Sequence, residues 1–236
     1  MIYITGDTHG DFSRILEFCH INKTTKDDVM IVLGDACINY HNNEKDDLLK
    51  ELLDYLPVTL LCIHGNHEER PYLVKNKNNK YIYKEKKMFG GVVYVEKGHP
   101  NILFAKDGEY YHIGKHYFFV IGGAYSIDKY YRLSHGYNWF ESEQPNEEIK
   151  KRVKSKLIEL DYKVDIVLTH TAPLKYEPTE FFMKGVNQNK VDKSTEKWLD
   201  SIEGKLKYNR WYFGHYHHYK KIDRIIMLYE EIEIIE

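Results

Sequence analysis

The chain has 236 residues, of which 42% are hydrophobic and 30% are charged, a balance typical of a folded globular protein. The formal net charge of −2 provides no overall positive field, so nucleic acid is not favoured as a partner. The longest apolar runs are far shorter than the roughly 20 residues that a membrane helix needs, so we expect no membrane span. The length suits one large domain, and we expect a single domain over residues 1–236.

Two features bear on the cellular location. The N-terminal residues show no basic region followed by a long apolar stretch, so no secretory signal is visible. The three cysteines, Cys19, Cys37 and Cys62, are odd in number and lack paired metal spacing, which fits a reducing compartment. We therefore expect reduced cysteines and a cytoplasmic protein.

Short runs rich in Val, Ile and Leu recur along the chain and are typical of buried strands. They cover residues 2–5, 29–33, 58–63, 118–121, 166–168 and 211–213. Apolar residues at helical spacing predict helices over residues 12–21, 44–55, 146–160 and 194–202. The chain therefore begins as β-α-β-α-β, and its last residues, 220–236, predict a pair of strands.

Two segments differ from this pattern. Residues 75–87 are dense in Lys, Asn and Tyr and predict a solvated loop with a short strand. Residues 122–145 show little periodicity and hold many tyrosines. Because long loops inside compact domains are usually functional or disordered, we interpret residues 122–145 as a Tyr-rich loop near the functional site.

Five predicted strands end in side chains that can bind a metal ion. The motifs are GDTHGD at residues 6–11, GD at 34–35, GNHE at 65–68, His170, and GHYH at 214–217. In open α/β sheets, ligands bind beyond the carboxyl ends of the strands, where residues distant in sequence converge. Glycine precedes four of the five motifs, which suits a tight turn and a close backbone approach.

The donors of these motifs form one mixed set. They are Asp7, His9, Asp35, Asn66, His170, His215 and His217. Two carboxylates, one amide oxygen and four imidazoles suit Mn, Fe, Zn or Ni rather than Ca. Seven ligands are too many for one tetrahedral ion, but a bridging carboxylate lets them serve two. We therefore expect two divalent metal ions.

Two ions a few Å apart are suited to in-line displacement at phosphorus, because they lower the pKa of a bridging water and neutralise charge on the attacked group. Hydroxide would then be the nucleophile. His67 lies next to Asn66 and has no metal in this scheme. We assign it the role of protonating the leaving oxygen or stabilising the equatorial charge.

The motifs resemble those of the calcineurin-like metallophosphoesterase superfamily, in the family's order and over residues 5–217. The resemblance implies two packed mixed β-sheets flanked by helices, a four-layer α/β sandwich. It implies that Asp7, His9 and His217 hold one metal and Asn66, His170 and His215 the other. In this assignment Asp35 bridges the two ions.

One departure concerns the family's protein serine/threonine phosphatase branch, which usually extends the second motif to GDxVDRG. Here residues 34–40 read GDACINY, without the aspartate that orients the catalytic histidine or the arginine that binds phosphate. Arg70 and Arg132 are candidate replacements for the phosphate clamp, because a guanidinium binds phosphate in bidentate fashion. Tyr125 is a candidate substrate contact.

The leading hypothesis is thus a metal-dependent phosphoesterase acting on a phosphate ester, with a nucleotide as one candidate. The alternatives are a cyclic-nucleotide or nucleic-acid phosphodiesterase or nuclease, a phosphoprotein phosphatase, and an inactive scaffold of the same fold. Stacking tyrosines beside the site suit a base. The sequence leaves open the substrate, the native metal, the oligomeric state and the choice between monoester and diester.

Overall fold

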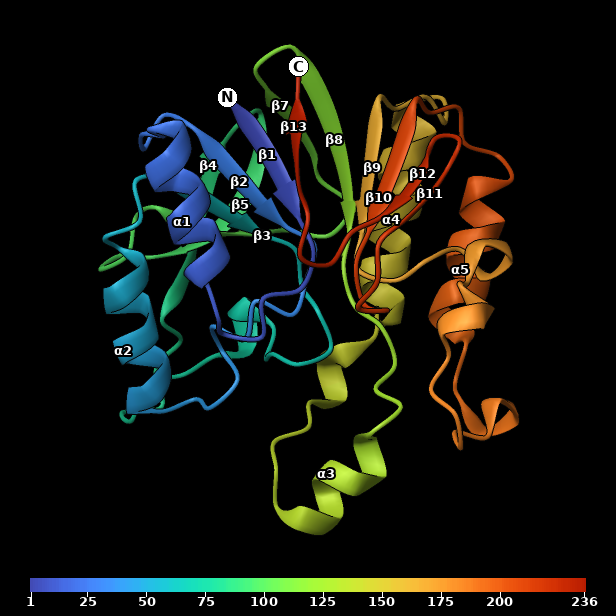
Figure 1. Ribbon diagram of the computed structural model, residues 1–236, viewed down its shortest axis with the longest axis horizontal. Coiled ribbons are helices and arrows are strands. Elements are labelled where there is room, and N and C mark those ends of the chain that lie inside the picture. Colours follow the sequence, from blue (N-terminus) through green and yellow to red (C-terminus); the bar gives the residue numbers. More distant parts are fainter.

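The computed structural model describes residues 1–236 and contains two mixed β-sheets (Figure 1). The first sheet has the order β13-β1-β2-β3-β6-β5-β4. Its strands are β1 (Ile2–Thr5), β2 (Val29–Val32), β3 (Thr59–Cys62), β4 (Tyr83–Met88), β5 (Gly91–Glu96), β6 (Ile102–Ala105) and β13 (Ile232–Ile235). Strands β1, β2, β3 and β6 are parallel, while β13, β5 and β4 pair antiparallel to their neighbours.

The second sheet has the order β11-β12-β10-β9-β8-β7. Its strands are β7 (Tyr110–Ile113), β8 (His116–Ile121), β9 (Ile166–Thr169), β10 (Arg210–Phe213), β11 (Lys220–Ile222) and β12 (Ile225–Met227). Strands β8, β9, β10 and β12 are parallel, and β7 and β11 form the antiparallel edges.

The two sheets share a buried apolar layer. Successive side chains of a strand point to opposite faces, so Ile2 and Ile4 of β1 enter this layer while Tyr3 faces the other side. Phe118 and Leu168 reach the same layer from the second sheet. The two sheets therefore pack face to face through this layer.

Helices cover the outer face of each sheet (Figure 1). The helices α1 (Ser13–Asn22) and α2 (Glu44–Leu53) bury Ile15 and Leu53 against the first sheet. The helices α4 (Glu147–Glu159) and α5 (Ser194–Glu203) bury Val153 and Leu199 against Trp211 of the second sheet. Helix, sheet, sheet and helix are the four layers that the resemblance implied, and the expected fold class is confirmed.

The predicted strands and helices that lead into the motifs are present within one or two residues of their expected bounds, and the short strand expected within residues 75–87 is the start of β4. Two other expectations need correction. Residues 220–236 form three strands rather than a pair, because β11 and β12 join the second sheet and β13 returns to the first. The Tyr-rich segment 122–145 is not loop throughout, since it includes a helix, α3 (Lys129–His135).

Helix α3 projects beyond the ends of the sheets (Figure 1). Five short 3-10 helices complete the structure: η1 (Pro71–Leu73), η2 (Glu141–Glu143), η3 (Leu174–Tyr176), η4 (Thr179–Phe181) and η5 (Gln188–Lys190). None of the helices has both the length and the apolar character needed to cross a membrane.

Candidate metal centre

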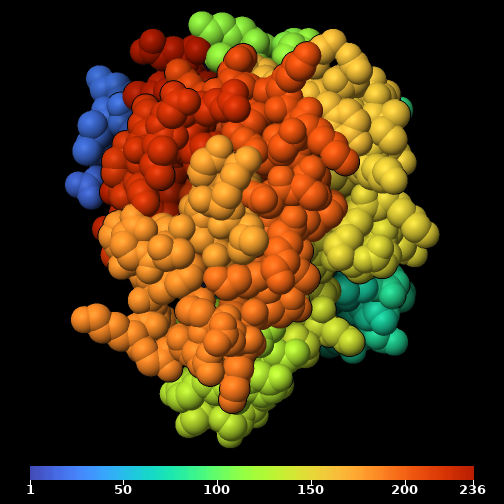
Figure 2. All heavy atoms as spheres, turned by 90° about the vertical axis from the view of Figure 1, so that its right-hand side faces the viewer, coloured from blue at the N-terminus to red at the C-terminus, as the bar shows by residue number.

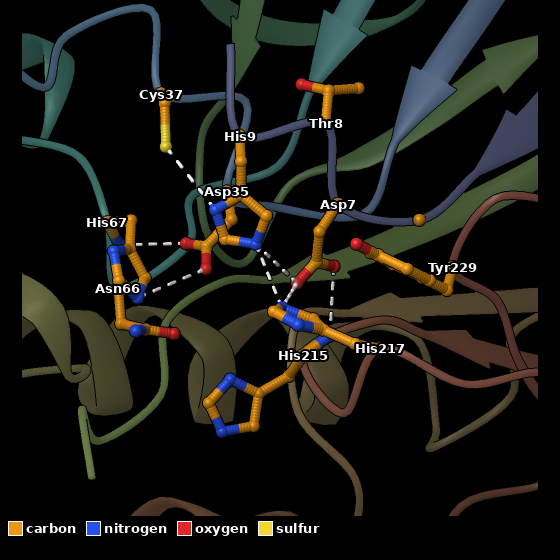
Figure 3. Close-up of polar contacts among 12 residues, drawn as sticks. Asp7, Thr8, His9, Asp35, Cys37, Asn66, His67, His215, His217 and Tyr229 are labelled. Carbon is orange, nitrogen blue, oxygen red and sulfur yellow. Dashed lines mark hydrogen bonds and ion pairs between the residues drawn. The ribbon is translucent and has the colours of Figure 1, made fainter. Parts of the chain in front are cut away.

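The seven predicted ligands come from loops that follow five parallel strands. Strands β1, β2 and β3 of the first sheet lead into Asp7, His9, Asp35 and Asn66, and β9 and β10 of the second lead into the remaining histidines. Figure 3 shows the side chains of the two sheets converging. The boundary between the sheets thus brings together residues up to 210 positions apart in the chain.

Asp7, His9 and His217 form the first group of potential ligands. The Nε2 atoms of His9 and His217 lie 2.9 Å apart and are 3.8 and 3.3 Å from Oδ2 of Asp7 (Figure 3). That oxygen is buried and accepts no hydrogen bond. The ring of His217 stacks on Tyr229 with 4.8 Å between centroids, which orients its imidazole.

Asp7, Asp35 and His170 form the second group. Nε2 of His170 lies 3.5 Å from Oδ1 of Asp35 and 2.9 Å from Oδ1 of Asn66. Its Nδ1 donates to the carbonyl of Leu33 at 2.7 Å, which directs Nε2 into the site. Burial opposes a charged ring, but the Asp35 carboxylate outweighs it and raises the pKa of His170 to about 9.

His215 completes the set beside His170, with 5.0 Å between the two ring centroids. Burial lowers the pKa of His215 to about 3, and the positive charge of His170 acts in the same direction. The ring is therefore neutral, the form that binds a metal. The backbone N–H of His215 donates to Oδ1 of Asp7 at 2.9 Å, which ties the two sheets together at the site.

The loops approach one another so closely that glycine is required at two positions. A Cβ on Gly65 would fall 2.0 Å from Oδ1 of Asp35, and one on Gly214 would fall 2.2 Å from Oδ1 of Asp7. Both distances are well inside van der Waals contact. Gly65 thus leaves space for the carboxylate that follows the neighbouring strand, and Gly214 leaves space for the carboxylate of the other sheet.

Four of the ligand residues also have left-handed backbone conformations. The φ angles are 48° at His9, 47° at Asp35, 72° at His215 and 52° at His217. Non-glycine residues seldom adopt this region, although Asp and His do so more often than most. The tight turns place these side chains directly after their strands.

His67 lies between the metal ligands and helix α3. Its backbone N–H donates to Oδ1 of Asp35 at 2.8 Å, and its Nε2 lies 4.0 Å from the other carboxylate oxygen (Figure 3). On the opposite side of the ring, the guanidinium of Arg132 lies 3.4 Å from Nδ1. Because a guanidinium only donates, this contact leaves the ring proton on Nε2, facing the metal site.

Arg132 also belongs to a buried network that fixes Asn66. The guanidinium donates to Oγ of Ser126 and to the carbonyl of Asn138. Ser126 in turn accepts from the amide nitrogen of Asn66 at 3.0 Å and donates to Glu143 at 2.5 Å. The amide of Asn66 is thereby turned so that Oδ1 faces His170.

Sequence reasoning missed Ser126 and Glu143, because Ser126 lies 60 positions from its partner Asn66 and Glu143 acts on Asn66 only through Ser126. It also missed how Glu68 contributes. This side chain is fully buried, accepts from the backbone N–H of Gly65 at 3.1 Å, and holds the GNHE loop. Burial, with the nearby charge of Asp35, raises the pKa of Glu68 to about 8.

The three candidate substrate contacts occupy different places. Arg70 is buried, pairs with Asp107 at 2.5 Å and donates to the carbonyl of Ser142 at 2.7 Å, so its guanidinium has structural partners away from the metal ligands. Arg132 is buried behind His67. Tyr125 alone of the three lines the hollow above the metal ligands.

The donor set fits two divalent cations. The buried Oδ2 atom of Asp7 has no hydrogen-bond donor, and it lies among imidazole nitrogens that face the same space. A buried carboxylate oxygen that accepts no hydrogen bond is costly unless a cation or a proton compensates it. With Asp35 and Asn66 beside it, the cluster supplies carboxylate, amide and imidazole donors to that space.

Two packed mixed sheets with Asp, Asn and His donors at their shared edge define an α/β sandwich with a candidate dinuclear metal centre. The family model described as calcineurin-like phosphoesterase matches residues 1–219, and the chain belongs to that family. Members of the family are in general metal-dependent hydrolases of phosphate esters that bind two divalent metals.

A solved structure shares the fold. The crystal structure of the protein TT1561 of Thermus thermophilus is 14% identical, with a TM-score of 0.53. The likeness covers 96% of this chain and 87% of that one. A search of curated proteins found no match.

Proposed function

We propose that the protein hydrolyses phosphate esters with two divalent metal ions, Mn, Fe, Zn or Ni. Asp7, His9 and His217 would hold one ion, and Asn66, His170 and His215 the other, with Asp35 between them. The observation that carries the proposal is that Asp7, shared between two groups of possible ligands, meets His9 and His217 in one and Asp35 and His170 in the other, with its Oδ2 buried and accepting no hydrogen bond. When bound, the ions would activate water as the nucleophile and neutralise charge on the phosphoryl group.

His67 acts on the phosphoryl group or its leaving oxygen in this proposal. The Arg132 guanidinium at Nδ1 leaves the proton of the neutral ring on Nε2, which faces the ligand Asp35. From Nε2 the neutral ring would donate a hydrogen bond that stabilises charge on the phosphoryl group, and the ring would act as an acid toward the leaving oxygen only as the imidazolium, which returns to the neutral form when it loses the proton. Loss of a positioned general acid typically lowers the rate by about 10²–10⁴-fold.

The test uses purified protein that is stripped of metal and then given Mn or Ni. The assay measures turnover of p-nitrophenyl phosphate and bis(p-nitrophenyl) phosphate, and we expect hydrolysis that requires added metal. His67→Ala should lower kcat by about 10²-fold or more while metal content is unchanged. His20→Ala, on the exposed surface of α1, is the matched control. Absence of turnover with metal bound would refute the proposal and favour an inactive scaffold.

A cytoplasmic location stays a prediction. The three cysteines are free in the structure, in keeping with the reducing compartment expected from their number.

A further inference from the structure

Two hollows meet at the candidate metal centre. The first measures about 520 Å³ and extends from His67 and the metal ligands toward Tyr125 and residues 181–183. The second measures about 480 Å³ and extends toward Tyr40 and Lys45. His9 and His67 line both hollows. Each volume is in the range of about 300–1,000 Å³ typical of ligand pockets.

Phe181 and Phe182 form an aromatic wall of the first hollow, with Met183 next to them in the chain. Phe182 stacks on Tyr216, which lies between the ligands His215 and His217, with the ring planes at 20°. Phe181 stacks on His218 at 4.1 Å between centroids. The wall is thus attached directly to the ligand loop that follows β10.

Several apolar side chains that line this hollow are exposed to solvent. Phe181, Met183 and Ile127 expose 37%, 66% and 43% of their surface. Ile127 and Tyr125, which come from the segment after β8, line the same hollow as the aromatic wall. Figure 2 shows the orange residues of the 174–193 segment next to the lime residues around α3. A flat apolar group bound between these two segments would remove the exposed apolar side chains from water.

Charge decides what kind of group fits there. Asp128, Glu177 and Glu196 line the first hollow, and Lys193 is the lysine that lines it. Nζ of Lys193 is already paired with Glu177 at 2.6 Å. Asp128 is likewise paired with Arg132, so neither cation is free to bind a further phosphate group. An uncharged aromatic group needs no such cation.

We propose that the substrate is a phosphodiester with one flat, uncharged aromatic ester group, a nucleoside or an aryl group, seated on the aromatic wall. The second ester group extends into the second hollow, which the phosphoryl site joins at His9 and His67. A monoester would leave one hollow without a substituent. This inference rests on the proposed function, since it places the phosphoryl group at the metal ligands.

The binding test compares diphenyl phosphate with dimethyl phosphate, which carry the same charge and differ in their aromatic groups. Both are measured as competitive inhibitors of the Mn-loaded protein and by ligand-observed NMR with metal-loaded protein. We expect diphenyl phosphate to bind at least about tenfold more tightly, because stacking on aromatic side chains contributes at this level. Equal affinities would overturn the aromatic subsite.

Phe182→Ala should weaken diphenyl phosphate about tenfold and leave dimethyl phosphate within about twofold. Phe181→Leu, which keeps an apolar side chain but removes the ring, should show a smaller loss of the same sign. Tyr55→Ala removes an 84% exposed ring just after the end of α2 and should change neither affinity. Unchanged diphenyl phosphate binding in both wall variants would also refute the subsite.

The diester part is tested by the ratio of kcat/KM for bis(p-nitrophenyl) phosphate to that for p-nitrophenyl phosphate. We expect the diester to be preferred, and preference for the monoester would overturn this part. The two proposals fail separately. Selective binding of diphenyl phosphate without any hydrolysis would refute the catalytic function alone, whereas hydrolysis without selectivity would refute the aromatic subsite alone.

Discussion

Nε2 of His217 lies 3.3 Å from Oδ2 of Asp7, a buried oxygen that accepts no hydrogen bond. The pair joins the loop after β10 of one sheet to the loop after β1 of the other. A cation held between them would therefore stabilise the contact between the sheets as well as complete the site.

This relationship predicts that metal stabilises the fold through Asp7. Manganese at a free concentration of about 100 times its Kd should add about 2.7 kcal/mol to the free energy of unfolding. For a chain of this size, Tm should rise by roughly 2–4 °C per kcal/mol. Differential scanning fluorimetry with and without EDTA measures the effect. Asp7→Asn should lose most of it, while Asp47→Asn on the exposed face of α2 should retain it; equal stabilisation of both variants would contradict a metal at Asp7.

Gly214→Ala should disturb the Asp7 carboxylate at its other oxygen, Oδ1. The added Cβ would fall 2.2 Å from Oδ1 of Asp7, so the carboxylate or the loop must move. We expect the unfolding free energy to fall by about 1–3 kcal/mol, the usual cost of overpacking, together with weaker metal binding. Urea unfolding and metal analysis measure the two effects. Gly98→Ala has nothing within 4 Å of the new atom and should change neither.

Arg132→Lys tests whether this residue orients His67 or binds phosphate. Lysine keeps the charge but lacks the planar fork that contacts His67 and Ser126 together. If Arg132 orients the ring, kcat should fall by about tenfold or more with KM and metal content unchanged. Arg224→Lys, at a residue that packs on Tyr208 away from the site, is the control. A rise in KM with constant kcat would instead support the phosphate clamp predicted from sequence.

Glu196 should make stability depend on pH. Its side chain is 4% exposed, and burial raises its pKa from 4.5 to about 7. The folded state therefore binds this proton more tightly than the unfolded state, and the corresponding stability is present below about pH 4.5 and lost as pH rises toward 7. A shift of this size corresponds to on the order of 3 kcal/mol.

Glu196→Gln should remove the loss of stability that Glu196 causes as pH rises toward 7. In metal-free buffer, urea unfolding should give similar stabilities for wild type and variant at about pH 4.5, and a more stable variant at about pH 8. Glu159→Gln, on the exposed side of α4, should show no such gain. The expectation fails if Glu196→Gln follows the wild type at both pH values.

Much of the centre of the fold was predictable because its strands are continuous apolar runs. The strands β1, β2, β3, β9 and β10 are buried throughout or nearly so, and each ends in a polar motif. The edge strand β4 was harder to predict, because all its lysines are exposed and its sequence is typical of a solvated segment. The membership of β13 in the first sheet depends on pairing with β1, more than 200 residues away.

The sequence predicted which donor residues form the site, but it did not predict the contacts that hold their side chains in place. His67 stands beside Asn66 in the sequence, but Arg132 reaches it from α3 only through the fold. Arg70 appeared available for phosphate because its partner Asp107 lies 37 positions further along. Three carboxylates line the first hollow although Asp128 follows β8, Glu177 follows η3 and Glu196 belongs to α5, so only the fold brings them together.

The left-handed turns at His9, Asp35, His215 and His217 limit how this centre can be redesigned. A β-branched residue at any of these positions would meet a backbone conformation that it strongly disfavours. Replacing one of these ligands to favour a different ion would therefore alter the backbone conformation as well as the ligand chemistry. Substitutions at Asn66 and His170, where the backbone is ordinary, offer the easier route to altered metal preference.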